Sequence, residues 1–106
     1  LVRLTGKDKE LQIESKRELN KIELSSYPNP FNPMTKITFN LPENNIVSLS
    51  IYNSLGEEIK RIVDRKELVK GVYTFNWNAS NYSSGVYFYV LQAGMYIETK
   101  KIILMK

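Results

Sequence analysis

Few side chains in this chain of 106 residues could carry out catalysis. Cysteine and histidine are absent, which removes thiolate nucleophiles, the commonest general base and the commonest ligands of zinc. Carboxylates remain, but Glu57 and Glu58 are neighbours and would point to opposite faces of a strand, which is the wrong geometry for an acid and base pair. No phosphate-binding loop or nucleophile elbow is present. The residues therefore predict no enzymatic activity, no metal site and no cofactor.

A basic cluster is the second candidate for chemistry. The net charge is +4, and the cluster consists of Lys60, Arg61, Arg65, Lys66 and Lys70. Such side chains could contact phosphate, but no recognition helix or RNA-binding motif accompanies them. Asp64 and Glu67 lie in the same stretch, where surface ion pairing is the ordinary outcome. We expect a solvated loop here and no nucleic-acid partner.

Aromatic side chains offer a third kind of site, because their ring faces can stack on sugars. A strip for polysaccharide could form from Tyr82, Tyr87, Tyr89 and Tyr96, although strand alternation splits them between two faces. Trp77 is the single tryptophan, and we expect it to anchor the core, since burying such a ring removes about 150 to 250 Å² from water. The tyrosines keep open the alternative of an adhesive or carbohydrate-binding accessory module of a secreted protein.

The elements that would position these side chains are short strands. Apolar residues alternate with polar ones in three runs: Ile37, Phe39 and Leu41; Val47, Leu49 and Ile51; Tyr73, Phe75 and Trp77. Residues 86–91 are apolar or aromatic on both faces, as is typical of a strand inside a sheet. Turn formers separate the runs, and Gly56 is expected at positive φ. About seven strands with a turn roughly every ten residues predict an all-β, immunoglobulin- or fibronectin-like antiparallel β-sandwich.

Two stretches are ambiguous. Residues 57–69 fit helical spacing through Ile59, Ile62 and Val63, but the flanking turns favour a strand over residues 57–63. Residues 1–26 are charged, and the alternation of Leu11 and Ile13, and of Ile22 and Leu24, with polar residues favours short strands over the competing helix through residues 10–22. We expect residues 1–26 to be a connector or the end of an upstream module, and residues 27–106 to be the main domain. Since the chain starts at Leu1 rather than at methionine, we expect it to be part of a longer protein.

The two ends of residues 27–106 are their most distinctive parts. Residues 27–33 contain three prolines, which lack the amide hydrogen that a sheet ladder needs, so a stiff approach to the sheet or an edge strand is expected. Residues 102–105 are apolar and lie between lysines, a pattern that protects a last strand from aggregation. A terminal strand is also available for strand addition by a partner.

Taken in order, these motifs resemble those of the type IX secretion C-terminal sorting domains of type A. The resemblance covers residues 27–106 and rests on Tyr27 to Pro33, Thr35-x-Ile37-x-Phe39-x-Leu41-Pro42, Leu49-x-Ile51-Tyr52-Asn53-x-x-Gly56, Trp77, Gly85-Val86-Tyr87-Phe88-Tyr89, Gly94 and the basic, apolar terminus. The immunoglobulin-like domains of flagellar hook-capping proteins share the proline opening and the Gly-Val-Tyr-Phe-Tyr strand by resemblance. An assembly domain of that kind is a third hypothesis.

The resemblance implies a signal domain that directs a larger cargo protein across the outer membrane through type IX secretion and to cell-surface attachment. It implies a route through the periplasm of a Gram-negative bacterium, an upstream cargo domain in the same chain, an outer-membrane translocon or shuttle protein, and a sortase-like peptidase that cleaves in or near residues 1–26. The recognition residues to which it points are Gly85, Tyr87, Gly94, Lys100, Lys101, Ile102, Leu104 and Lys106. No transmembrane segment is expected, since the apolar runs fall far short of the roughly 20 residues that span a bilayer.

Overall fold

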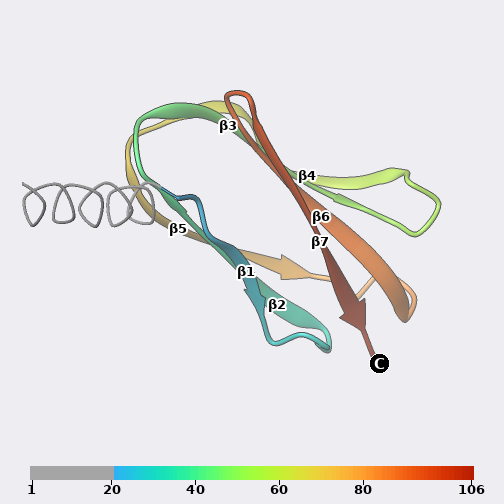
Figure 1. The fold of residues 1–106 in the computed structure, drawn as a ribbon. Helices are drawn as coiled ribbons and strands as arrows, with labels where there is room; N and C mark the ends of the chain where they lie inside the picture. The colour runs from blue at the N-terminus through green and yellow to red at the C-terminus, as the bar shows by residue number, and fades with distance from the viewer. Residues whose placement is uncertain (1–20) are drawn as a thin grey trace, which may run out of the picture.

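The computed structural model describes residues 21–106, which fold into two facing β-sheets (Figure 1). The strands are β1 (Leu24–Tyr27), β2 (Met34–Leu41), β3 (Asn45–Tyr52), β4 (Glu58–Leu68), β5 (Gly71–Asn78), β6 (Gly85–Ala93) and β7 (Tyr96–Leu104). One sheet has the order β1-β2-β5 and the other β4-β3-β6-β7, and all pairings between named strands are antiparallel. The predicted all-β sandwich of about seven strands is confirmed.

The core follows the alternation of the sequence. In β2 the side chains of Ile37 and Phe39 are completely buried, and in β3 those of Leu49 and Ile51 are. Strand β6 lies between β3 and β7, as its two apolar faces predicted. Because full burial of one such side chain contributes about 1.5 to 3 kcal/mol, these inward positions hold the two sheets together.

Strand β4 is longer than expected. It runs Glu58–Leu68, so the prediction of a loop over the basic cluster was wrong, and so was the end of the strand at residue 63. Its pairing with β3 contains several register shifts, and Arg65 has a φ of 47°. At this bulge the Arg65 amide donates a hydrogen bond of 3.0 Å to the Ser48 hydroxyl. The bulges explain the irregular apolar spacing, which imitates a helix.

Four aromatic rings form a cluster at one end of the core, which we call the Trp77 cluster. Trp77 is 2% exposed, as expected of a core anchor. Its ring centroid lies 5.3 Å from that of Phe31, 5.8 Å from Tyr82 and 5.5 Å from Tyr87. The buried indole N–H has no hydrogen-bond partner within the described part of the chain. Trp77 therefore contributes through packing. It joins β5 to Tyr87 of β6, to the loop that carries Phe31 and to the loop that carries Tyr82.

We expect Trp77→Ala to lower the free energy of unfolding by about 3 to 5 kcal/mol, because it removes a large buried ring and leaves a cavity. Chemical denaturation followed by circular dichroism measures this change. Tyr27→Ala is the matched control, since Tyr27 is 81% exposed and its loss should change stability by no more than about 0.5 kcal/mol. A loss below about 1 kcal/mol for Trp77→Ala would contradict its role as the anchor.

Candidate functional site

The last strand places its neighbouring residues on opposite faces of the sheet. Ile102 and Leu104 are 0% and 1% exposed, and they point into the core. Lys101 is exposed on the outer face, whereas Lys100 is half-buried on the inner face that it shares with Ile102. Lys100 and Lys101 therefore do not form one basic patch.

The C-terminal half of β7 is covered by residues 28–33, which we call the proline loop. Phe31 forms a parallel bridge with Leu104. The Phe31 amide donates to the Ile103 carbonyl at 2.9 Å, and the Met105 amide donates to the Phe31 carbonyl at 3.0 Å. Phe31 is 2% exposed, because its ring packs on Trp77. One residue of the proline loop thus adds a short parallel strand to the outer edge of β7.

Asn29 extends this contact with its side chain. Its Oδ1 accepts a hydrogen bond of 3.0 Å from the Ile103 amide, and its Nδ2 donates one of 3.2 Å to the Lys101 carbonyl. The side-chain amide therefore occupies the place that a backbone peptide group would take in a sheet ladder. The loop itself is held by the Thr35 hydroxyl, which donates to the Pro28 carbonyl at 2.8 Å.

The end of the chain is consequently built into the sandwich. Asn29 and Phe31 already occupy the edge of β7 from Lys101 to Met105, so the expected opening for strand addition at this terminal edge is closed. Lys106 is attached as well, since its Nζ donates to the Ser80 carbonyl at 2.6 Å and its amide to the Ser84 hydroxyl at 2.9 Å. A partner protein that recognises these C-terminal residues would therefore contact them as part of the folded domain.

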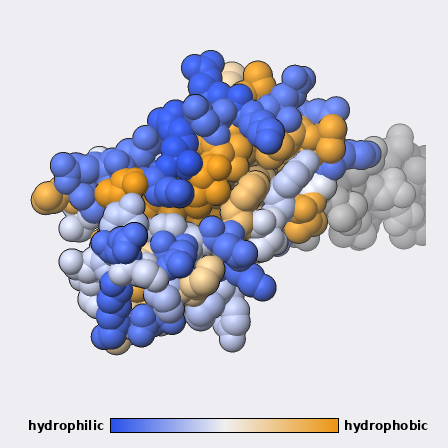
Figure 2. Space-filling view, turned by 180° about the vertical axis from the view of Figure 1, so that it is seen from behind, coloured by the Kyte–Doolittle hydropathy of each residue, from blue (hydrophilic) through white to orange (hydrophobic). Residues whose placement is uncertain are grey.

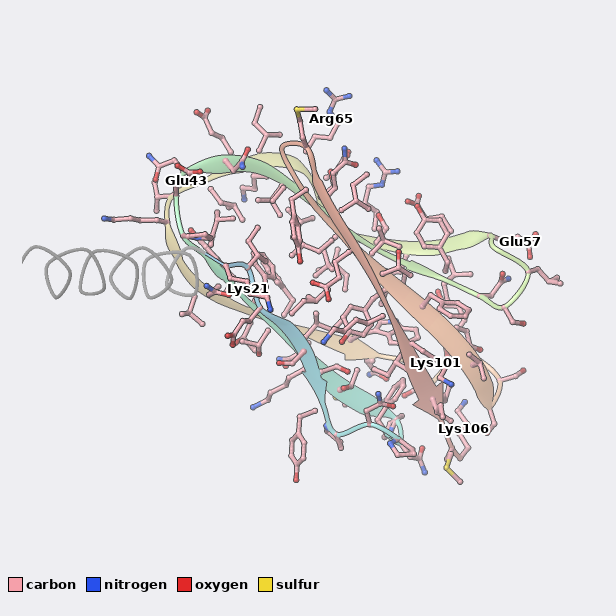
Figure 3. The ribbon with its side chains drawn as sticks, in the orientation of Figure 1. Lys21, Glu43, Glu57, Arg65, Lys101 and Lys106 are labelled. Carbon is pink, nitrogen blue, oxygen red and sulfur yellow. The ribbon has the colours of Figure 1, made fainter. Side chains whose placement is uncertain are left out.

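The structure divides the eight expected recognition residues among different places. Tyr87, Ile102 and Leu104 are buried, so they shape the strand pair β6–β7 without being accessible. Gly85 pairs with Leu104 near the C-terminus, and Lys101 and Lys106 lie at this same end (Figure 3). Gly94 is at the other end of β6, and the strand's length of nine residues separates it from Gly85 by roughly 25 to 30 Å.

Gly94 has a structural reason to be glycine. It turns the chain from β6 into β7 with a φ of 62°, a conformation that other residues rarely adopt. A Cβ atom at this position would lie 2.8 Å from the Asn45 Oδ1. The geometry of the hairpin turn is thus sufficient to explain the glycine at position 94, and no contact with a partner protein is needed to explain it.

The outer face of the four-stranded sheet contains a shallow hollow of about 420 Å³, lined by Ser48, Ser50, Tyr52, Arg61, Arg65 and Gln92 among others. Arg61 bridges Glu58 and Asp64, with an N–O distance of 2.9 Å to each carboxylate. The hydrogen bond from Arg61 lowers the pKa of Glu58, and a hydrogen bond from Ser50 acts in the same direction. The carboxylates beside this hollow are thus engaged in surface ion pairs.

The tyrosines do not form an exposed strip. Tyr87 and Tyr89 are 7% and 1% exposed, and half-buried Tyr82 packs on Trp77. The Tyr87 hydroxyl donates to the Ser83 carbonyl at 2.6 Å. At Tyr96, burial and then a hydrogen bond donated to Glu98 raise the pKa of the hydroxyl to about 12. Buried rings cannot stack on a glycan, which removes the basis for a carbohydrate site on Tyr87 and Tyr89.

Residues 21–106 contain no group of three acidic side chains that could hold a metal ion. In the same part of the chain we find no helix with the length and apolarity needed to cross a membrane.

Comparison with known proteins gives a family. The family model of the secretion system C-terminal sorting domain matches residues 25–105. The match begins within β1 and ends directly after β7, so it covers nearly the whole sandwich. A comparison with curated proteins found no match.

We expect Asn29→Ala to lower the free energy of unfolding by about 1 to 2 kcal/mol, because two hydrogen bonds to β7 are lost and each is worth about 1 kcal/mol. Hydrogen exchange measured by NMR should show faster exchange of the Ile103 amide, which donates to Asn29. Asn32→Ala is the control, since exposed Asn32 lies in the same loop and makes none of these contacts to β7. Unchanged exchange at Ile103 would show that the side chain of Asn29 does not close the edge.

Proposed function

Because the chain belongs to the secretion system C-terminal sorting domain family, we propose that its folded sandwich directs a larger cargo protein across the outer membrane and to attachment at the cell surface. The family supplies a type IX sorting signal and is not a family of enzymes. The chain itself acts as a signal and has no catalytic role. Its cargo is an upstream domain of the same protein.

The contact between the proline loop and β7 is the observation that supports a folded signal. The two most distinctive parts of the sequence, residues 27–33 and 100–106, meet in one structure through Asn29, Phe31 and Ile103. A signal read as an extended tail would need its last residues free. Here those residues are paired on both sides, by β6 and by the proline loop. The machinery therefore recognises a surface that exists only after folding.

We place the centre of this surface at the end of the sandwich that holds the C-terminus. Gly85, Lys101 and Lys106 are exposed there, and the two lysines give it a positive charge. The partner is an outer-membrane translocon or shuttle protein of the type IX system, which the folded domain reaches from the periplasm of a Gram-negative bacterium. Tyr87, Ile102 and Leu104 act indirectly by holding the strands that present this surface.

Cleavage by a sortase-like peptidase falls in or near residues 1–26, on the N-terminal side of β1, since β1 (Leu24–Tyr27) is already part of the sandwich. This position suits the fold, because the strands from β2 to β7 are all interlocked through the sheets and the proline loop. Burial of Tyr87 and Tyr89 favours sorting over glycan binding.

A reporter fused ahead of the full chain of 106 residues should reach the surface of a host with a type IX system. The double variant Lys101→Glu with Lys106→Glu should leave the fusion folded in the periplasm, because it reverses the charge of the proposed surface. Surface proteolysis and cell fractionation measure the location. Lys100 is left unchanged, since it is half-buried and its reversal could disturb folding.

The matched control is Lys66→Glu with Lys70→Glu, which changes the net charge equally at two exposed positions near the other end of β6, where Val47 pairs with both Lys66 and Ala93. Its export should equal that of the parent. Export of the first double variant at the parent level would show that recognition does not use Lys101 and Lys106. Retention of the parent fusion itself would reject the sorting proposal.

A further inference from the structure

The four outer strands of the two sheets differ in how well they are protected from pairing with other chains. Exposed strand edges are templates for association, and proteins block them with charges, bulges, proline or short length. Strand β4 is charged and bulged, and β1 has four residues. Strand β7 carries Glu98, Lys100 and Lys101 and is covered at its end by the proline loop.

Strand β5 has none of these protections. Its eight residues, Gly71 to Asn78, include no charged side chain and no proline. Its pairing with β2 is uninterrupted over all eight residues, so no bulge bends it away. None of the other described strands pairs with its far side, because β5 is the last strand of the order β1-β2-β5.

The backbone groups on this free edge can be assigned from the register. The Asn40 amide donates to Glu23, so the backbone groups of the even-numbered residues of β2 point toward β1 and those of its odd-numbered residues toward β5. Trp77 is paired with Thr35, and the amides and carbonyls of the odd-numbered residues of β5 therefore point toward β2. Those of Val72, Thr74 and Asn76 point outward, where they can accept a further strand.

Apolar side chains border the same edge. Tyr73 and Phe75 are half-buried on the inner face of β5, and Val72 is 72% exposed on its outer face. Half-buried Ile59 and Ile62 of β4 also pack against the core. Figure 2 shows the rear of the molecule, where apolar side chains reach the surface in a band with polar side chains above and below. A strand added to β5 would cover the partly exposed Tyr73 and Phe75.

We propose that β5 pairs in antiparallel orientation with β5 of a second copy of this chain, with Thr74 on the twofold axis. In this register Thr74 lies opposite Thr74 of the second copy, and Val72 lies opposite Asn76. Val72, Thr74 and Asn76 then all form hydrogen-bonded pairs, each of which exchanges two N–H···O bonds. Tyr73 lies opposite Phe75 of the second copy on the inner face, which places two aromatic pairs across the junction.

A second copy fits this edge better than a different partner does. A charged strand that pairs with a second copy of itself brings two equal net charges together, whereas β5 carries no charge that would oppose this pairing. The same lack of charge gives no electrostatic means of selecting an acidic or a basic strand. The pattern around the axis is self-complementary as well, because an aromatic residue stands on each side of Thr74, Tyr73 before it and Phe75 after it.

Cysteine cross-linking tests the register, and the natural chain contains no cysteine that could interfere. Thr74→Cys should form an intermolecular disulfide under mild oxidation, since the Cα atoms of a hydrogen-bonded pair lie about 5.5 Å apart, within the range of a disulfide. Val72→Cys is the matched control on the same exposed face. Its two copies would lie four residues out of register, roughly 13 Å apart, which is too far for a disulfide.

A second pair of variants tests the backbone pairing without oxidation. Thr74→Pro removes an amide hydrogen that points away from β2, so the native ladder keeps its hydrogen bonds. Sedimentation over a dilution series should show the dimer dissociation constant increased on the order of tenfold or more, because both copies lose a hydrogen bond. Thr74→Val keeps the amide, loses only the hydroxyl that contacts Thr38, and should dimerise like the parent.

The proposal stands independently of secretion, because each measurement uses the purified chain. It is overturned if the parent sediments as a monomer at every concentration. Equal cross-linking of the Thr74→Cys and Val72→Cys chains would also overturn it, since that result indicates association without a register. If Thr74→Pro fails to fold, as judged by circular dichroism, the cysteine pair still decides the question.

Discussion

The contact between Phe31 and Leu104 is the interaction on which the C-terminal end of this sandwich depends. It joins two segments that are far apart in the chain, and the neighbouring contact of Asn29 with Ile103 spans 74 residues. Closing such a long loop costs conformational entropy, which the burial of Phe31 in the Trp77 cluster offsets. Without this anchor the outer edge of β7 would be open along its whole length. The proline loop thus completes the fold and closes the edge of β7 from Lys101 to Met105 at the same time.

The sequence predicted the strands and the core well, because alternation is a local signal. Ile37, Leu49 and Ile51 are buried as their spacing indicated, and β6 lies inside its sheet, as its two apolar faces predicted. The contact of Asn29 with β7 could not be predicted, since nothing local in the proline loop specifies a partner more than seventy residues away. Strand β4 was shortened in the prediction because its bulges interrupt the period of two.

The expected recognition residues show a related limit. A sequence motif contains both the buried residues that hold a surface in shape and the exposed residues that form it. The motif alone does not tell these two kinds of residue apart. Alternation alone separates Lys100 from Lys101, and burial removes Tyr87, Ile102 and Leu104 from direct contact. Lys101 and Lys106 stay together because the chain end is fixed to Ser80 and to the proline loop. The candidate site is therefore smaller than the motif, and its geometry depends on buried side chains.

The two surfaces proposed for this domain are compatible because they lie on different edges of the sandwich. Strand β7 lies next to β1, whereas β5 is the opposite edge of the sheet that contains β1 (Figure 1). A second copy paired with β5 would extend that sheet away from β7 and leave Lys101 and Lys106 exposed. The β7 edge and the β5 edge also differ in their chemistry. The β7 side combines charge with a backbone edge that is closed from Lys101 to Met105, which suits recognition by side chains. The β5 side combines an open backbone edge with uncharged residues, which suits pairing between strands.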